Sequence, residues 1–326
     1  MTHRDFRIAA VAVLSCLPLA GAAAQDGGDR APQTPWGDPD LQGVWTNATL
    51  TPVERPASMA DRRVLTTEEA AALETRSAEQ RVASDRFIPG NVGAYNQFWM
   101  DGGTNVTGDR RTSLIVDPPD GRIPWTEAGR RRFENDSARY GVGPFDTHID
   151  ADTGERCLTD GLPFVPLQGY NMNYQILQSP GWVAIINEMF HEYRLIPVDG
   201  RDHIPPHVGQ ILGDARGRWE GDTLVVETRS FADTRHFLWR ATWRAARPSL
   251  RLVERFTRVS ADTIDYEFTM RDPEMFTRPW TALVPMTTDQ ASRGVTSGPL
   301  FEYACHEGNY GLRNIMRGAR MAELER

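Results

Sequence analysis

The stretch Thr263-Ile264-Asp265-Tyr266-Glu267-Phe268-Thr269-Met270-Arg271 decides the fold class of this chain. Every second residue from Ile264 to Met270 is apolar, and the residues between them are polar. This period of two is that of a β-strand with one buried face. After a turn at Asp272-Pro273, every second residue from Trp280 to Met286 is apolar again. The two segments therefore predict successive antiparallel strands.

Four further segments are rich in β-forming residues, and they complete the predicted sheet: Trp182 to Asn187, Tyr193 to Val198, Gly217 to Val226, and Leu250 to Val259. The third contains Glu220-Gly221-Asp222, which is typical of a hairpin turn. Repeated antiparallel strands at this spacing predict a mainly β fold, in which a meander curls into a lipocalin-like barrel or a bent sheet. The N-terminal half is loop-rich, and few short helices are expected.

The chain divides into three predicted parts: a signal peptide (1–24), a flexible arm (25–40) and a single β-rich domain (41–326). We expect the domain to be loop-rich over 41–174, to form the β-meander over 175–305 and to end in a helix over 312–323. A short strand is predicted at 41–46. A helix is predicted to begin with Thr66 or Thr67 as its N-cap, to carry Glu68 and Glu69 in its first turn, and to end near Ser84.

The first residues have the layout of a secretory signal peptide. A basic region with Arg4 and Arg7 precedes the apolar run 8–19, and an A-x-A cleavage site ends at Ala24. The apolar run is shorter than the roughly 20 residues that span a bilayer. A lipoprotein reading that uses Cys16 is the alternative. The sequence therefore predicts a periplasmic or secreted protein that is not inserted in the membrane once the signal is removed.

Composition excludes several kinds of chemistry. The chain contains no lysine, so Schiff-base catalysis, attachment of pyridoxal phosphate and a phosphate-loop lysine are ruled out. The formal net charge of −8 argues against a nucleic-acid or anionic-membrane partner. The sequence contains no G-x-S-x-G, H-E-x-x-H or strand-linked G-x-G-x-x-G motif. We therefore expect no organic cofactor, and the sequence leaves the oligomeric state open.

Two cysteines, Cys157 and Cys305, remain after signal cleavage. In an oxidising compartment they are expected to form a disulfide. The chain-entropy estimate for so long a loop is on the order of 5 kcal/mol. A metal thiolate or a nucleophilic cysteine is the alternative.

Two groups of side chains are candidates for acid–base catalysis. Glu188, His191 and Arg194 lie around a predicted hairpin end, and His306 and Glu307 follow Cys305 directly. An imidazole beside a carboxylate can act as acid or base near neutral pH. The alternatives are solvated surface charges for the first group, and for the second a histidine that only bonds a backbone carbonyl.

Other residues are candidates for substrate binding. Arg255 and Glu267 lie on predicted strands, where a structural ion pair is the alternative. Trp219 and Trp280 belong to a tryptophan-rich set that could line a cavity for an apolar, aromatic or sugar-like ligand, or could fill the core.

Two segments contain residues that could bind a metal ion. In His203-Ile204-Pro205-Pro206-His207 the prolines prevent the helical turn that would place both imidazoles on one face. His191, His306 and one of these could still converge on zinc or copper. The acidic segment 148–155 could hold calcium, but it lacks the spacing of an EF-hand and favours a solvated turn. No metal ligand is therefore assigned.

Four segments together resemble a group of exported bacterial proteins of uncharacterised function: Glu155 to Leu158, Glu188 to Arg194, Gly217 to Val226, and Tyr303 to Tyr310. The resemblance extends over most of the mature chain. It implies export and implies no reaction.

The sequence thus predicts an exported enzyme that acts on a small organic molecule in a barrel pocket. The reaction would be an elimination, an isomerisation or a hydrolysis. His306 or His191 would be the acid–base catalyst, Glu307 or Glu188 the orienting carboxylate, and Arg194 the group that holds the substrate. A non-catalytic lipocalin-like binding protein, a histidine-ligated metalloenzyme and a structural envelope protein are the alternatives.

Overall fold

The structure is a computed structural model, and it describes residues 32–84, 101–165, 169, 171–234, 242–244, 247–295 and 297–325. The predicted signal peptide and the first part of the predicted arm lie outside these residues. The described part of the arm makes a turn in which the Thr34 N–H donates to the Asp38 carbonyl at 2.8 Å. Arg258 then donates to the Asp40 carbonyl at 2.8 Å, which ties this segment to the sheet.

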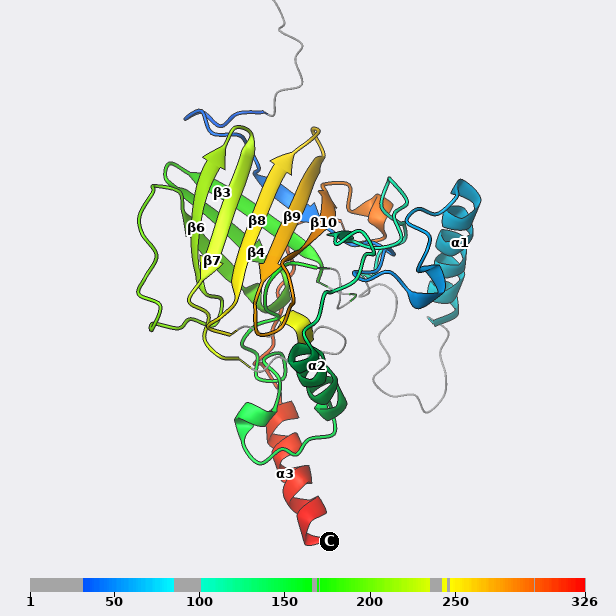
Figure 1. The fold of residues 1–326 in the computed structure, drawn as a ribbon, viewed down its shortest axis with the longest axis vertical. Helices are drawn as coiled ribbons and strands as arrows, with labels where there is room; N and C mark the ends of the chain where they lie inside the picture. The colour runs from blue at the N-terminus through cyan, green and yellow to red at the C-terminus, as the bar shows by residue number, and fades with distance from the viewer. Residues whose placement is uncertain are drawn as a thin grey trace, which may run out of the picture. The chain divides into compact units, whose positions relative to one another are not determined.

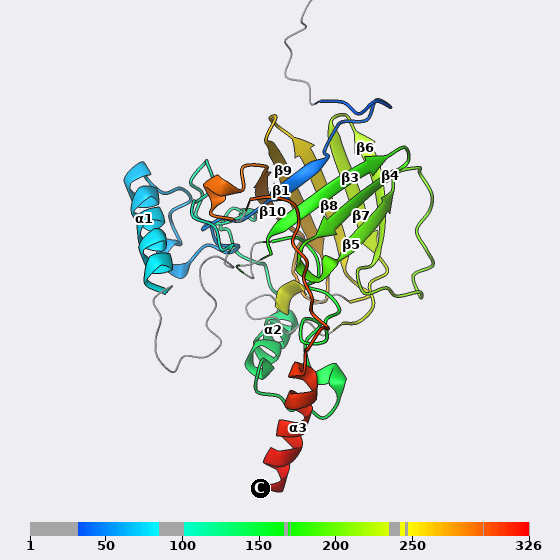
Figure 2. The ribbon, with the colours of Figure 1, turned by 180° about the vertical axis from the view of Figure 1, so that it is seen from behind.

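The fold is mainly β, with one antiparallel sheet that nearly closes into a barrel (Figures 1 and 2). Its order is β5-β4-β3-β1-β10-β9-β8-β7-β6, and β2 pairs with β10. The strands are β1 (Gly43–Thr46), β2 (Ile115–Asp117), β3 (Asn173–Ser179), β4 (Trp182–Asn187), β5 (Tyr193–Pro197), β6 (Asp214–Glu220), β7 (Thr223–Arg229), β8 (Arg251–Arg258), β9 (Thr263–Arg271) and β10 (Trp280–Thr287).

The sheet consists of two meanders joined by β1. Strands β6 to β10 follow one another, as do β3 to β5, while β1 pairs with β3 on one side and β10 on the other. The N-terminal half, predicted to be loop-rich, thus supplies the strand that joins the two meanders. At the opposite seam β5 and β6 approach each other. Gly217 makes this approach feasible, because a Cβ there would lie 2.7 Å from Val198 and 3.0 Å from Ile196.

The alternation that predicted β9 and β10 is the pattern of burial observed. Ile264, Tyr266, Phe268 and Met270 are at most 1% exposed, and the alternate residues of β10 pack beside them. Trp280 is completely buried, and its ring centroid lies 5.2 Å from that of Trp243. Large side chains therefore fill the barrel interior, and Trp280 belongs to this core.

In the part of the chain that the structure describes, three α-helices lie outside the sheet: α1 (Thr67–Ser84), α2 (Glu127–Arg139) and α3 (Gly311–Leu324). Thr66 and Glu69 form a reciprocal capping box that fixes the start of α1, where the sequence predicts it. Helix α2 was not predicted; Thr126 caps it by accepting the Gly129 N–H at 2.9 Å. Helices α2 and α3 lie beyond one end of the barrel (Figures 1 and 2). Within the described residues, no helix has the length and apolar character needed to cross a membrane.

Short 3-10 turns complete the described structure: η1 (Ala57–Met59), η3 (His148–Asp150), η4 (Met189–His191), η5 (Thr242–Arg244) and η6 (Ala291–Arg293). Turn η4 joins β4 to β5 and η3 follows α2. Both turns lie next to residues that form the candidate site.

Candidate functional site

Cys157 and Cys305 form the predicted disulfide, with their Cα atoms 5.7 Å apart. The bridge connects the segment after η3 to the segment that leads into α3. The Asn309 amide donates to the Cys157 sulfur at 3.3 Å, and its oxygen accepts the Gly311 N–H at 2.8 Å. The disulfide therefore fixes the start of α3 as well as the segment before it.

The η4 turn holds the same C-terminal segment through two of the predicted catalytic residues. His191 accepts the Tyr303 N–H at its Nε2 atom, at 3.0 Å. Glu188 is 1% exposed, and it accepts the Phe301 N–H at 2.9 Å and the Asn173 amide at 2.9 Å. In this structure Glu188 and His191 therefore bind backbone N–H groups and hold the C-terminal segment in place.

The backbone of this turn is unusual, since Phe190 and His191 have φ angles of 61° and 49°. Non-glycine residues rarely adopt this left-handed region. The conformation places the Phe190 ring against that of Tyr303, with centroids 4.9 Å apart in an edge-on arrangement. Three of the four motif segments quoted in the sequence analysis thus meet at one place: Glu155 to Leu158, Glu188 to Arg194, and Tyr303 to Tyr310.

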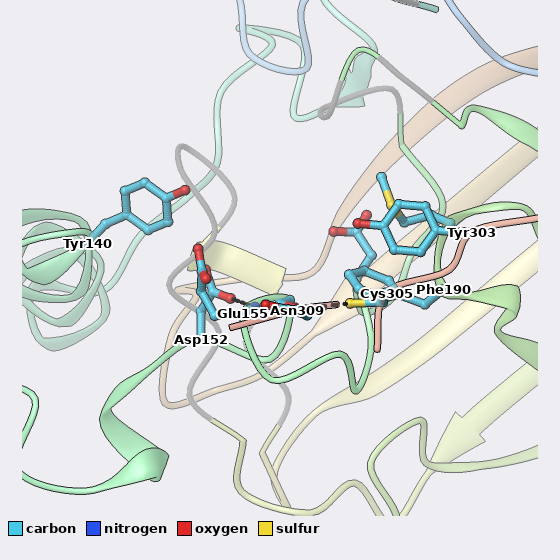
Figure 3. A pocket seen from close by; sticks show the side chains of 10 residues that line it. Tyr140, Asp152, Glu155, Phe190, Tyr303, Cys305 and Asn309 are labelled. Atoms are coloured by element: carbon cyan, nitrogen blue, oxygen red, sulfur yellow. Dashed lines mark hydrogen bonds between the residues drawn. The ribbon is translucent and has the colours of Figure 1, made fainter. Parts of the chain in front are cut away.

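A cleft of about 210 Å³ opens where these segments meet (Figure 3). Its lining combines carboxylates with aromatic rings, and comprises Tyr140, Asp152, Gly154, Glu155, Asp160, Met189, Phe190, Tyr303, Cys305 and Asn309. Tyr140, Asp152 and Glu155 lie on one side of the cleft, opposite Phe190, Tyr303 and Cys305 (Figure 3). The cleft lies outside the filled barrel interior.

The carboxyl groups of Asp152 and Glu155 have altered pKa values. Burial raises the pKa of Asp152, although the backbone N–H groups of Glu155 and Gly154 oppose this effect by stabilising the anion. The first of these bonds is 2.6 Å long. Burial and then the charge of Asp152 raise the pKa of Glu155. Burial, with the charges of both carboxylates, also raises the pKa of Tyr140, so its hydroxyl remains a hydrogen-bond donor at neutral pH.

Behind the cleft lies a buried polar cluster to which Asp160 also belongs. Arg244 donates to Asp160 at 3.2 Å, and the Thr159 hydroxyl donates to Glu192 Oε2. Glu192 is 8% exposed, and its Oε1 has no hydrogen-bond partner among the described residues. Burial is the main reason that the pKa of Glu192 rises to about 7. The wall of the cleft thus adjoins a carboxyl group that titrates near neutrality.

Arg194, predicted to hold the substrate, lies inside the barrel. Its guanidinium makes two bonds to Glu254, at 2.6 and 3.0 Å, and one to Thr228 at 3.1 Å. The Tyr266 hydroxyl donates to the same Glu254 at 2.8 Å. The Arg194 and Glu254 side chains are 3% and 0% exposed. Arg194 is therefore a member of a buried ion pair and is not among the residues that line the cleft.

The remaining predicted residues are not among those that line the cleft. His306 and Glu307 are exposed and are not part of its lining. On the barrel wall, Arg255 pairs with Glu220 at 2.9 Å and lies opposite Glu267 in the strand register. Trp219 is half-buried against the core. The structure thus brings Glu188, His191, Cys157 and Cys305 to one place, and His306 and Glu307 lie on the same segment, between the cleft-lining Cys305 and Asn309. The predicted residues on the sheet lie elsewhere: Arg194, Trp219, Arg255, Glu267 and Trp280.

The described part of the chain contains no group of three His, Cys, Asp or Glu side chains arranged to hold a metal ion. His203 instead bonds Asp214 at 2.8 Å. The histidine-ligated alternative therefore has no geometric support in these residues.

Most of the residues that line the cleft were not predicted from the sequence. Asp152 and Glu155 belong to the acidic segment 148–155, whose sequence favours a solvated turn over a calcium site. Their position just before Cys157 was the available signal, because a disulfide partner would bring them to the segment around Cys305. Nothing comparable in the sequence indicated Tyr140 or Asp160.

Comparisons with known proteins add no relatives: no protein-family model, curated protein or solved structure matches the chain.

Proposed function

We propose that this chain is an exported enzyme that transforms a small, oxygen-rich organic molecule by acid–base chemistry in the cleft beside the disulfide. The observation that carries the proposal is the Asp152 and Glu155 pair, two carboxyl groups with raised pKa values that face a cleft walled by aromatic rings. Perturbed carboxyls in a cleft are a recognised sign of catalysis. The disulfide is compatible with a periplasmic or secreted location.

The two carboxyl groups suit different roles. Asp152 receives two backbone N–H groups that favour its anion, so it is the better base. Glu155 has no backbone donor among the causes of its shift, and the neighbouring charge of Asp152 favours its protonated form. Glu155 is therefore the better acid. Tyr140 would donate a hydrogen bond to the substrate, and the rings of Phe190 and Tyr303 would pack on its flat face.

This assignment moves the acid–base role from the imidazoles to the carboxyls. His191 would position Tyr303, because its Nε2 accepts that residue's backbone N–H. Hydrolysis, elimination and isomerisation are all reactions that such a pair can promote.

The test is a mass-spectrometric screen of the purified, oxidised protein against a library of sugars, glycosides and phenolic esters. Glu155→Gln and Asp152→Asn should each lower kcat by about 100-fold or more, since general acid–base catalysis contributes that much. Glu134→Gln, an exposed carboxyl on α2, is the matched control and should keep full turnover. Full activity in Glu155→Gln together with its loss in His306→Ala would return the chemistry to the imidazole.

A non-catalytic binding protein is the second candidate. The filled barrel interior means that a carrier would use this same open cleft. Retention of an unchanged compound by the parent protein and by Glu155→Gln, with no product from either, would favour the carrier.

A further inference from the structure

A second hollow adjoins the cleft and shares three residues with it. It has a volume of about 110 Å³, and its lining includes Arg139, Phe145, Asp150 and Ile315. Tyr140, Asp152 and Glu155 line both spaces. The proposed catalytic carboxyls therefore stand between two compartments.

The second hollow is the more apolar of the two. Phe145, Ala151, Ile315 and the Tyr140 ring form its apolar surfaces, and Ala151 is almost completely buried. Asp152 and Glu155 line it only where it meets the cleft, and its other two charged residues, Arg139 and Asp150, bind each other at 3.2 Å. Because this pair is internally compensated, the hollow favours an uncharged apolar group.

The walls of this hollow are held in place by the rest of the fold. The disulfide and Asn309 fix the start of α3, which carries Ile315. Further along α3, Arg320 donates to the Phe145 carbonyl at 3.1 Å and forms an ion pair with Asp146 at 3.6 Å. Ile315 and Phe145 are thus brought together by contacts on both sides, so the hollow exists before a ligand binds.

We propose that the hollow binds the apolar part of a two-part substrate, in which an alkyl or aryl group is joined through oxygen to a polar head in the cleft. This inference rests on the proposed function and names its substrate class. An engineered cavity of about 150 Å³ holds the six carbon atoms of benzene, so a hollow of about 110 Å³ encloses about four carbon atoms. A short alkyl group fits inside it, and a phenyl ring fits with one edge at the junction with the cleft.

The position of the carboxyls then identifies the bond that reacts. With the head in the cleft and the tail in the hollow, the bridging oxygen lies at the junction that Glu155 lines. Glu155 gives its proton to that oxygen as the bond between the oxygen and the head carbon breaks. Water forms a new bond to the head carbon and gives a proton to Asp152. The products are the hydroxylated head and a free alcohol or phenol, and proton exchange with solvent restores both carboxyls.

Benzyl alcohol binding, measured by two-dimensional NMR or calorimetry, tests whether the hollow binds an apolar group, independently of catalysis. Ile315→Ser should weaken this binding by about tenfold, because it removes apolar surface at the hollow. Leu324→Ser, at an 81% exposed position of the same helix, is the matched control and should leave it unchanged. Ile315→Phe, which fills the space, should also weaken binding. Thermal unfolding would verify that each variant folds.

The outcomes separate the two proposals. No binding of benzyl alcohol, or equal binding by the parent and both Ile315 variants, would overturn the assignment of the hollow even for an active enzyme. Binding that depends on Ile315 supports the hollow even where no compound is turned over, a result that would count against the enzyme. In an active protein, benzyl or phenyl substrates should exceed their methyl analogues in kcat/KM by about tenfold or more, and Ile315→Ser should remove that preference.

Discussion

Replacing Glu192 by glutamine should make the protein more stable at alkaline pH. Glu192 is buried, and its pKa is raised from 4.5 to about 7. The groups that face it are Thr159, Asp160, Arg194 and Arg244. Burial is the largest cause of the shift, and the two arginines oppose it. The native state therefore holds a proton on Glu192 at pH values where the unfolded chain has lost it.

The difference in Glu192 protonation between the native and unfolded states determines the sign and size of the change in stability. Between pH 4.5 and about 7 the native state binds more protons than the unfolded state, so the free energy of unfolding falls as pH rises. A shift of this size corresponds to about 3 kcal/mol at 1.36 kcal/mol per unit. Glutamine resembles the protonated acid and cannot ionise. The stability of Glu192→Gln relative to the parent should therefore rise by about 3 kcal/mol between pH 4 and pH 8.

Urea unfolding followed by tryptophan fluorescence, at a series of pH values in oxidising buffer, measures this difference. Comparing the two proteins at each pH cancels the titration of the other groups. A stability difference that stays constant from pH 4 to pH 8 would refute the reasoning, as would a variant that loses stability at pH 8. The same substitution at Glu254 is the contrasting control. It leaves the buried Arg194 charge without its partner and should destabilise the protein at both pH values by about 3–5 kcal/mol.

Two further predictions concern the disulfide and the seam between β5 and β6. Reducing the Cys157–Cys305 bridge, or replacing both cysteines by serine, should lower the free energy of unfolding by about 2–5 kcal/mol, which urea titration with and without reductant would measure. An unchanged midpoint would show that the bridge does not restrain the chain. Gly217→Ala should cost about 1–3 kcal/mol because its Cβ would lie 2.7 Å from Val198 at the seam. Gly318→Ala on α3, where a Cβ meets nothing within 4 Å, should instead be neutral or stabilising. Thermal unfolding of the two variants measures both effects, and equal melting temperatures would contradict the steric reasoning at Gly217.

Local patterns in the sequence predicted the elements whose causes are local. Strand β9 has the predicted bounds, and the β6–β7 hairpin turns at Gly221-Asp222. Helix α1 begins at its predicted cap, and α3 extends one residue beyond its prediction at each end. Nothing local indicated that β1 would separate the two meanders. Its partners lie more than 120 residues away, and pairing at that distance depends on the whole sheet.

Strand β5 shows why the barrel interior could not be predicted by hydrophobicity. Tyr193 and Leu195 are 65% and 58% exposed, whereas Arg194 is buried between them. The simple alternation rule would place the two apolar residues inside. Arg194 shares its face of β5 with Ile196, which is completely buried, and Glu254 of β8, inward-facing like its apolar neighbours Leu252 and Phe256, provides the charge that Arg194 requires. The partner that allows this arginine inside the barrel is thus 60 residues away along the chain.

The position of the motif segments suggests how chemistry and selectivity are divided in this protein. Glu188, His191 and the disulfide hold the C-terminal segment against the cleft, and Glu155 lies in the same motifs as the proposed acid. Phe145 and Ile315, which form the apolar hollow, lie outside those motifs. Glu188 and His191 accept backbone N–H groups and the bridge is covalent, so these contacts do not touch the substrate, whereas Phe190 and Tyr303 of the same motifs would pack on its head. The apolar walls, in contrast, touch the proposed substrate tail and nothing in the proposed reaction. We therefore expect proteins that share these motifs to share the frame and the acid, and to differ in the molecules that they accept.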